Sequence, residues 1–467
     1  MTSAQETTAH RTSRKSVFSR LAADYGMLAA LVLLCLFFSL RTMDEQHPNG
    51  AEGANKLAAE LSRSAGSRTL RVLIVARGND EDRQFAETLH SRLQSSGRFE
   101  VAGTVVGQPL EARQAMDRIV GAGGTLDLIA CNHTTGAWPV FDKLGEKIPE
   151  LREAKVVQPR SHRWPNFLKA DNLRNVANQI VVIGILAIGM TLVIITGGID
   201  LSVGSLIALS AVVTTLLIRN AAGGEQAGVV GMILCSLAAI GACGAVGLFS
   251  GAMVTFFAIP PFIVTLGIML VASGLAYILA GGQSIYQVPA SFIWLGRGTA
   301  VFGLPNAVVL MLVLYAAAHV LRARMALGRH VYAVGGNNEA ARLSGVPVGR
   351  VLLFVYTACG ALAGLGGVIT ASQLRSGSPT YGLMYELYVI AAVVVGGASL
   401  AGGEGKVLGT LIGAFIIAVI QNGMNLTNVE SYTQKVVLGV VILGAVLLDM
   451  LKKQGRLAFF GRRTKNR

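Results

Sequence analysis

The stretch GMTLVIITGGIDLSVGS, residues 189–205, decides the fold class of this chain. It is an apolar run with helical composition that is interrupted by Gly197 and Gly198. A second apolar run, far along the chain, is interrupted in the same way by Gly396 and Gly397. Paired hydrophobic segments broken by glycine are typical of the internal repeats that line transport paths. The pattern therefore predicts an all-α polytopic membrane protein with an internal repeat.

The composition agrees with a membrane protein. The chain has 467 residues, of which 52% are hydrophobic and 14% are charged. A soluble domain carries about a quarter charged residues, so this chain has too little polar surface to lie wholly in water. The abundance of glycine, 56 residues, fits helices that pack closely in lipid.

Ten apolar segments are candidate membrane spans. A span needs about 20 residues, and the first segment, 26–40, is short enough to be a cleaved signal peptide instead. No small-residue cleavage site follows it, so we expect a retained helix. The other nine segments are 175–196, 201–218, 228–256, 262–280, 301–321, 351–371, 387–399, 407–422 and 435–451.

The net charge of +14 indicates either nucleic acid or a membrane surface as a partner. Its distribution favours membrane lipid and no nucleic acid, because basic residues gather beside the apolar segments. They include Arg11, Arg14, Lys15 and Arg20 before the first segment, Arg322, Arg324, Arg329, Arg342 and Arg350 in one loop, and Lys452, Lys453, Arg456, Arg462, Arg463, Lys465 and Arg467 after the last. An even number of spans puts both termini and this loop on the cytoplasmic side, as the positive-inside rule requires.

Residues 42–163, between the first and second spans, have a different character. Strand-like runs at 70–76, 99–106, 126–131 and 155–158 alternate with helix-like runs at 81–96, 111–120 and 141–151. This alternation predicts an inserted α/β domain with a parallel sheet, and the positive-inside arrangement places it outside the cell. The expected domains are thus a cytoplasmic tail (1–22), the first membrane helix (23–41), the insert (42–163), the main membrane domain (164–451) and a basic cytoplasmic tail (452–467).

Polar residues near the breaks have two interpretations each. Asp200, with Ser202 beside it, is either the N-cap of the following helix or a residue that gates the transport path or contacts a neighbouring subunit. Glu386 is either a first-turn carboxylate favoured by the helix dipole or a functional group. We take all of them as candidate pathway residues, together with the four glycines of the breaks.

The cytoplasmic loop contains GGNNEAARLSGV, residues 335–346. Asn337 or Asn338 is placed to cap a short helix that begins near Glu339, and Gly345 is placed to end it. Such an exposed helix suits docking into a groove of a soluble partner, although spacing alone favours an ordinary cytoplasmic connector.

Nothing in the sequence indicates catalysis or a metal site. Lys406 follows a glycine, but a phosphate-binding loop would need glycine where Leu400 stands and serine or threonine where Val407 stands. The seven histidines are scattered, and the five cysteines have neither CxxC nor metal-ligand spacing. A membrane enzyme and a signalling receptor are therefore the weaker alternatives.

Five stretches together resemble the ABC-type permeases for monosaccharides of the ribose, xylose and galactose group. They are GMTLVIITGGIDLSVGS (189–205), IPPFIVTLG (259–267), GGNNEAARLSGV (335–346), YELYVIAAVVVGGASLAGGEGKVLGTLIGA (385–414) and QNGMNL (421–426). The chain departs from the family's pattern at Tyr388, where relatives commonly have aspartate, and at Ser250, where they often have asparagine.

The resemblance implies a permease homodimer in the bacterial inner membrane. It implies two partners, an ATPase subunit that binds ATP and magnesium, and an extracytoplasmic sugar-binding protein; no cofactor is expected on this chain. It also implies that the short cytoplasmic helix couples to the ATPase, through Glu339, Ala340, Ala341 and Gly345.

The insert is itself a departure from these permeases, which have only a short loop there. Its segments 72–89 and 112–132 resemble one lobe of a periplasmic sugar-binding protein. The insert is expected to dock the separate binding protein, to replace part of it, or to be an inert folded segment. Cys131 and His133 lie at a strand end, where α/β sheets bind ligands, but nothing further supports them as ligand contacts.

Overall fold

The computed structural model describes residues 26–64, 68–300 and 303–453. The expected cytoplasmic tail 1–22 lies outside these residues, as does most of the tail 452–467. The described chain divides into two compact units, and residues 43–166 form one of them. The other, here called the membrane unit, comprises the described residues before 43 and after 166.

The membrane unit has 7 helices that are long and apolar enough to cross a bilayer among the described residues. They are α7 (Ala170–Ile195), α8 (Val203–Ala221), α9 (Val229–Phe256), α10 (Pro261–Ala280), α12 (Asn306–Arg324), α15 (Val348–Leu374) and α17 (Val407–Leu426). Shorter apolar helices cover Gly26–Arg41, α16 (Tyr385–Val395) and most of α18 (Ser431–Lys453). A polytopic membrane fold is therefore present, and the count of ten spans stays a prediction.

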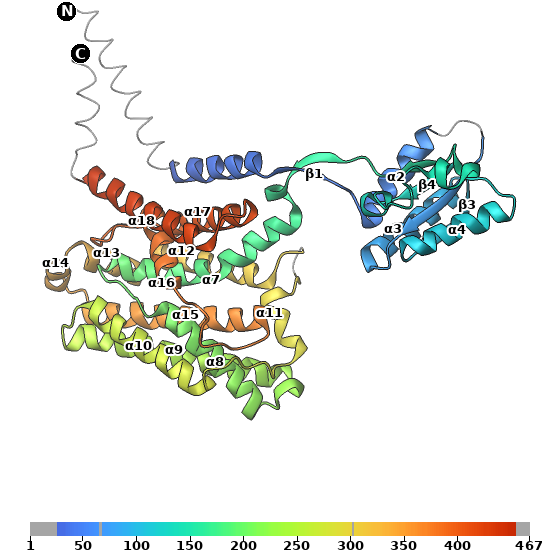
Figure 1. Ribbon diagram of the computed structural model, residues 1–467. Coiled ribbons are helices and arrows are strands. Elements are labelled where there is room, and N and C mark those ends of the chain that lie inside the picture. Colours follow the sequence, from blue (N-terminus) through green and yellow to red (C-terminus); the bar gives the residue numbers. More distant parts are fainter. Residues whose placement is uncertain (1–25, 65–67, 301–302, 454–467) are drawn as a thin grey trace, which may run out of the picture. The chain divides into compact units, whose positions relative to one another are not determined.

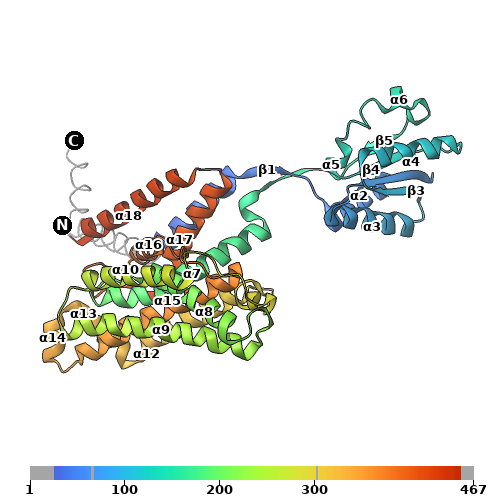
Figure 2. The same ribbon diagram turned by 60° about the horizontal axis from the view of Figure 1, so that its bottom comes forward.

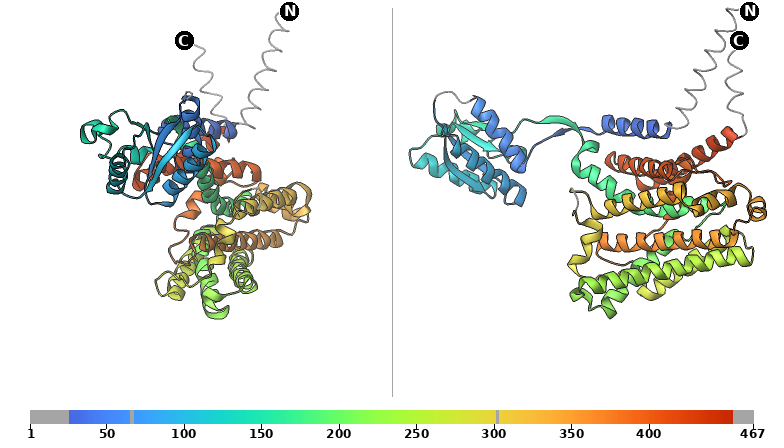
Figure 3. Two further views of the ribbon diagram at one scale, coloured as in Figure 1. Left: turned by 90° about the vertical axis from the view of Figure 1, so that its right-hand side faces the viewer. Right: turned by 180° about the vertical axis from the view of Figure 1, so that it is seen from behind.

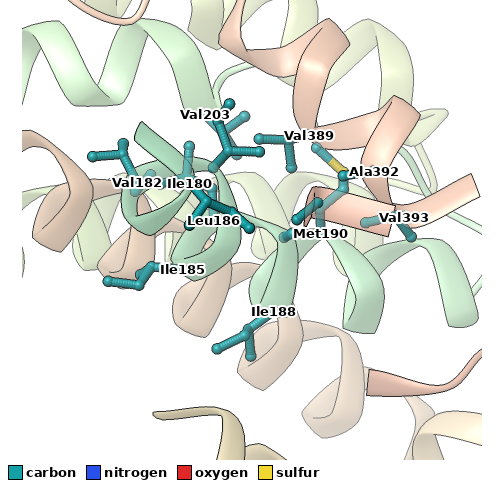
Figure 4. Close-up of a cluster of buried hydrophobic side chains, with 14 of the residues drawn as sticks. Ile180, Val182, Ile185, Leu186, Ile188, Met190, Val203, Val389, Ala392 and Val393 are labelled. Atoms are coloured by element: carbon teal, nitrogen blue, oxygen red, sulfur yellow. The ribbon is translucent and has the colours of Figure 1, made fainter. Parts of the chain in front are cut away.

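Helix α7 lies at the centre of the membrane unit. In its most apolar window 89% of the residues are buried, compared with 22% for α10. Its side chains pack against α8 and α16, as Figure 4 shows for Ile180, Leu186 and Met190 of α7 with Val203 and Val389. Because α10 leaves most of its apolar surface uncovered, that surface is available to lipid or to another subunit.

Helix α15 contacts α7, α8 and α9 (Figure 1), and the long helices run side by side in the right-hand view of Figure 3. Glycines permit the closest of these approaches. A Cβ at Gly360 of α15 would overlap the backbone of α9, because the carbonyl oxygen of Cys243 and the Cα of Gly247 occupy that space. Such small-residue contacts are the usual way in which membrane helices associate.

Shorter elements connect the long helices. Helices α17 and α18 follow one another directly and form a hairpin (Figure 2). The first apolar helix, Gly26–Arg41, places Phe38 directly over Gly423 of α17. The remaining connections contain η2 (Asn166–Leu168), η3 (Gly224–Gln226), η4 (Ala290–Ile293), α11 (Trp294–Arg297), α13 (Ala326–Gly336) and α14 (Asn338–Leu343).

The unit of residues 43–166 contains a parallel four-stranded sheet in the order β3-β2-β4-β5. Its strands are β2 (Leu70–Ala76), β3 (Phe99–Val106), β4 (Leu128–Cys131) and β5 (Lys155–Val157), and its helices are α3 (Asp80–Ser95), α4 (Pro109–Gly121), α5 (His133–Gly136) and α6 (Leu144–Lys147) with η1 (Pro149–Leu151). In place of one helix over 141–151, the structure has the short α6 and η1, because Pro149 cannot continue a helix.

Alternate residues of β2 face the two sides of this sheet. Ile74 packs with Leu57 and Phe85 on one face, whereas Leu73 packs with Met116 on the other. Some elements of this unit have no counterpart in the sequence-based prediction. They are α2 (Gly50–Ser64), the short α5, and an antiparallel ribbon of β1 (Met43–Gln46) with β6 (His162–Pro165).

Candidate translocation and coupling site

The two predicted glycine breaks have the same backbone geometry. At the end of α7, the N–H of Gly197 donates to the carbonyl of Ile194 (2.9 Å) and the N–H of Gly198 to that of Val193 (3.0 Å). At the end of α16, Gly397 donates to Val394 (2.9 Å) and Ala398 to Val393 (3.1 Å). This pair of bonds is the Schellman motif, which needs a left-handed residue one place after the cap.

Gly197 and Gly397 occupy that left-handed position, with φ of +80° and +86°. Gly396 is the C-cap of α16, and a Cβ there would meet the carbonyl oxygen of Gly409 and the Cα of Thr410, both at 2.6 Å. The breaks therefore end their helices without leaving the last carbonyls unsatisfied, which matters at membrane depth.

Asp200 is buried in the loop that leads from the first break into α8. Its Oδ1 accepts hydrogen bonds from the backbone N–H of Ser202 (3.0 Å) and from the Ser202 hydroxyl (2.6 Å). The structural N-cap of α8 is Ser202 itself, and it makes no side-chain capping bond. The N-cap of α8 therefore lies two residues after Asp200, although capping is one of the two expected roles of that residue. Asp200 instead shapes the turn before the helix.

Glycines from three separate pairs meet beside this turn. We call this place the glycine junction, and it consists of Gly197, Gly335, Gly402, Gly403 and Ile195. The N–H of Gly403 donates to the carbonyl of Ile195 (2.9 Å). A Cβ on Gly335 would overlap that same carbonyl, and a Cβ on Gly402 would lie 2.8 Å from the carbonyl of Gly335 and 3.2 Å from the Cα of Gly197. The end of α7, the end of α13 and the loop after α16 are therefore in backbone contact.

Sequence reasoning identified each of these glycine stretches but did not bring them together. Gly335, Gly402 and Gly403 belong to the sequence motifs but are not predicted pathway residues. The signal that could have singled them out is the occurrence of glycine pairs in three segments that all border apolar helices.

The short helix α14 follows the junction directly. The side chain of Asn337 accepts from the backbone N–H of Ala340 (2.9 Å) and caps the helix, as one of the two expected alternatives. Gly345 leaves it with φ of +81°. Glu339 and Ala340 are exposed, whereas Ala341 is buried.

The exposed face of α14 also carries Leu343, whose relative exposure of 88% exceeds that of the other exposed large hydrophobic residues. Beside it lies a cavity of about 780 Å³ between α14 and the end of α9, lined by Glu339 and Arg342 among others. An apolar side chain surrounded by charges on a projecting helix has the composition of a protein-docking surface.

Glu386 lies in the first turn of α16 and borders a pocket of about 230 Å³ with a mixed polar and apolar lining. The pocket is formed by the start of α8, the middle of α10 and the loop that precedes α16. Glu386 and the first break do not share this pocket, because Gly197, Gly198 and Asp200 are absent from its lining.

No group of three or more metal-ligating side chains occurs in the described parts of the chain. In the unit of residues 43–166, Cys131 ends β4 and Asn132 follows it, while Asp82 lies in the first turn of α3, the helix that follows β2. Burial raises the pKa of the Cys131 thiol to about 12, so it stays protonated and unreactive. Burial alone would raise the pKa of Asp82, but hydrogen bonds from Arg77, Asn49 and Asn132 outweigh it and lower that pKa.

This strand edge is filled by the chain itself. The amide of Asn49 donates to Asp82 (2.6 Å) and its oxygen accepts from Asn132 (3.0 Å). The ring of His47 stacks on that of His133, with 3.5 Å between their centroids. The position at which α/β sheets usually hold a ligand is therefore occupied by residues of the same unit.

Comparison with known proteins supports a transport role. The model of the family described as "branched-chain amino acid transport system / permease component" matches residues 172–446. The ribose import permease of Escherichia coli K12 is 42% identical over 297 residues, which is 62% of this chain and 88% of the relative. No solved structure matches the chain significantly.

The names of two further relatives from Escherichia coli K12 specify transport of other sugars. The galactose/methyl galactoside import permease is 36% identical over 300 residues, which is 62% of this chain and 89% of that protein. The D-allose transport permease is 35% identical over 285 residues, which is 61% of this chain and 85% of that protein.

Proposed function

This chain belongs to the family of ABC-type permeases for monosaccharides, and we propose that it forms the translocation pathway of such an importer and is driven by a separate ATPase through α14. The ATPase would bind ATP and magnesium, and a sugar-binding protein would deliver the sugar from outside. The permease would act as a homodimer in a bacterial inner membrane, with both termini in the cytoplasm.

The observation that carries this proposal is the glycine junction. Because α13 leads directly into α14, a displacement of α14 by a partner also moves Gly335. Gly335 lies against the carbonyl of Ile195, next to the break after α7, and Gly403 is bonded to that carbonyl. A cytoplasmic movement thus has a direct mechanical route to the ends of α7 and α16.

The transport cycle follows from two states of this assembly. ATP-driven closure of the partner would favour the state in which its groove holds α14 most tightly. The broken helices would then exchange between outward-open and inward-open arrangements, as a population shift driven by differential contacts. The breaks suit this exchange because their left-handed glycines change backbone angles at low cost.

Glu339→Arg tests the coupling role of α14. Reconstituted with its ATPase and binding protein, this variant should insert normally, lose sugar uptake and lose the stimulation of ATP hydrolysis by the binding protein. Glu225→Arg, an equally exposed carboxylate in η3, is the matched control and should behave as wild type. Unchanged uptake of labelled ribose, allose and galactose by Glu339→Arg would contradict the docking role.

The sidedness of α14 has its own test. In a chain with its five cysteines replaced, Leu343→Cys should react with a membrane-impermeant maleimide only from the cytoplasmic side. Labelling from outside would place α14 beyond the reach of an ATPase, and the proposed coupling would fail.

Of the roles expected for residues 43–166, replacement of a binding-protein lobe is the least favoured, because Asn49 and His47 fill the usual ligand position. Excision of residues 43–166 distinguishes the two remaining roles, docking of the binding protein and an inert insert. The N–H of Phe167 donates to Thr42 Oγ1 (3.1 Å), so the two ends of the deletion already lie together. Loss of binding-protein stimulation after excision favours docking, and retained stimulation favours an inert insert.

A further inference from the structure

We propose that the sugar in transit is held in the pocket at the start of α16, where the Glu386 carboxylate accepts hydrogen bonds from its hydroxyl groups. This inference rests on the proposed transport of a monosaccharide. It adds a substrate-binding site inside the permease, with a preference for neutral polyhydroxyl compounds over carboxylates.

The pocket combines hydroxyl and carboxylate groups with apolar side chains such as Leu270 and Leu383. It has a volume of about 230 Å³, which is below the range of about 300–1,000 Å³ that is typical of drug-sized ligands. Hydroxyl and carboxylate groups face it from three separate segments of the chain. They belong to Ser205 of α8, Ser273 and Tyr277 of α10, and Thr380, Tyr381 and Glu386 around the start of α16.

The Glu386 carboxylate has room only because its neighbour is glycine. A Cβ on Gly204 would overlap Glu386 Oε2 and would lie 2.6 Å from the carbonyl oxygen of Gly382. Within the described residues no cation pairs with Glu386, and neither Ser205 nor Ser273 makes a side-chain hydrogen bond. Intramembrane carboxylates without a partner usually face a substrate path.

The pocket lies near the middle of a membrane helix. Its α10 residues run from Met269 to Tyr277, within a helix that spans Pro261–Ala280. Helix α16 has only 11 residues, and Glu386 in its first turn is half-buried while Leu383 and Leu387 beside it are exposed. Transporters commonly bind their substrates at this depth, between discontinuous helices.

The loop that delivers Glu386 is held in an unusual conformation. Met384, the residue before α16, has φ of +69°, which is rare for a residue other than glycine. Such positions are strained and cluster at ligand sites. The backbone of Gly377, earlier in the same loop, is anchored to Ile285 by reciprocal bonds of 2.8 and 2.9 Å.

The chemistry of the pocket selects among substrates. The positive end of the α16 dipole would attract an anionic ligand, but Glu386 already supplies negative charge there. A carboxylate only accepts hydrogen bonds, so it pairs with the hydroxyl donors of a sugar and repels the carboxylate of an amino acid. The exposed ring of Tyr277 adds an apolar face of the kind that packs against the C–H groups of a sugar.

The test uses the full transporter, with its ATPase and binding protein, in proteoliposomes. Uptake of labelled ribose, allose, galactose and leucine is measured for wild type, Glu386→Gln and Ser273→Ala. Loss of a hydrogen-bond partner should lower uptake of the transported sugar about tenfold in Glu386→Gln and less in Ser273→Ala. Binding-protein-stimulated ATP hydrolysis should remain, because neither side chain touches α14 or the glycine junction.

Glu225→Gln and Ser236→Ala are the matched controls, since Ser236 bonds only to its own helix (2.8 Å to the carbonyl of Met232). Sugar uptake by Glu386→Gln and Ser273→Ala within about twofold of the controls would overturn the pocket while the proposed function stands. Wild-type uptake of leucine in place of every sugar would instead overturn the sugar assignment itself. If Glu386→Gln, at equal expression, changes the uptake rates of the three sugars relative to one another, that change supports direct contact between Glu386 and the sugar over a general loss of folding.

Discussion

The backbone N–H of Gly403 donates a hydrogen bond of 2.9 Å to the carbonyl oxygen of Ile195. This bond joins the loop after the second helix break to the last turn before the first break. The two breaks end in the same Schellman motif, and this bond fastens the end of α7 to the loop that follows the second motif. We expect a movement at one break to reach the other through this backbone contact.

Gly335→Ala should disrupt this junction. The added methyl group would overlap the Ile195 carbonyl, which also accepts the hydrogen bond from Gly403. Overpacking of this kind typically costs about 1–3 kcal/mol. We expect uptake to fall at least about tenfold, with ATP hydrolysis that no longer responds to the binding protein.

Gly336→Ala is the matched control for that variant. Gly336 is the next residue of the same helix, and a Cβ there meets nothing within 4 Å. It should therefore transport normally, with an unchanged melting temperature in detergent. Equal uptake by the two variants would show that the contact with Ile195 does not matter for transport.

Gly198 and Tyr356 form a second close pair that can be tested by compensation. A Cβ on Gly198 would overlap the Tyr356 hydroxyl oxygen, whereas the ring carbon that bears it is 3.5 Å away. That hydroxyl is buried and has no hydrogen-bond partner among the described residues. Gly198→Ala alone should destabilise the membrane unit by about 1–3 kcal/mol.

The double variant Gly198→Ala/Tyr356→Phe should recover most of that stability, and Tyr356→Phe alone should cost little. Thermal unfolding in detergent across the four proteins gives the coupling energy directly. Additive effects of the two substitutions would mean that the hydroxyl and the glycine are not in contact in the membrane.

The sequence predicted those features that depend on local pattern. Apolar runs of about 20 residues located the long helices, because a span must satisfy its backbone internally. Asn337 and Gly345 similarly marked the ends of α14. The glycine junction lay beyond such reasoning, since nothing local says that Gly335 and Gly402, 67 residues apart by their numbers, share one contact.

In the unit of residues 43–166, helix α2 could have been predicted from the sequence, whereas the ribbon of β1 with β6 could not. Ala54, Leu57, Ala58 and Leu61 have the i, i+3, i+4, i+7 spacing of an amphipathic helix and are all buried in α2. The ribbon of β1 with β6 offered no such signal. Its strands, MDEQ and HRWP, lack an apolar alternation and pair across more than a hundred residues.

The ion pair of Asp82 with Arg77 makes the stability of that unit depend on pH. The Asp82 side chain is fully buried, and its Oδ2 accepts from the Arg77 guanidinium (2.6 Å). Because its hydrogen bonds hold the pKa of Asp82 below the ordinary 3.8, the charged form stabilises the fold. This contribution is complete above pH 3.8 and is lost as the pH falls through the lower folded-state pKa.

Asp82→Asn should therefore destabilise the unit by about 1.5–3 kcal/mol near neutral pH, the range for hydrogen bonds to charged groups. The difference from wild type should shrink as the pH falls below 3.8. Denaturant unfolding of the full chain in detergent, in a Trp294→Phe background, reports on this unit through Trp138 and Trp164. Glu87→Gln, an exposed change in the same helix, should follow wild type at every pH. A loss in Asp82→Asn that stays constant down to pH values at which wild-type Asp82 is protonated would mean that packing, and not charge, holds this edge of the sheet.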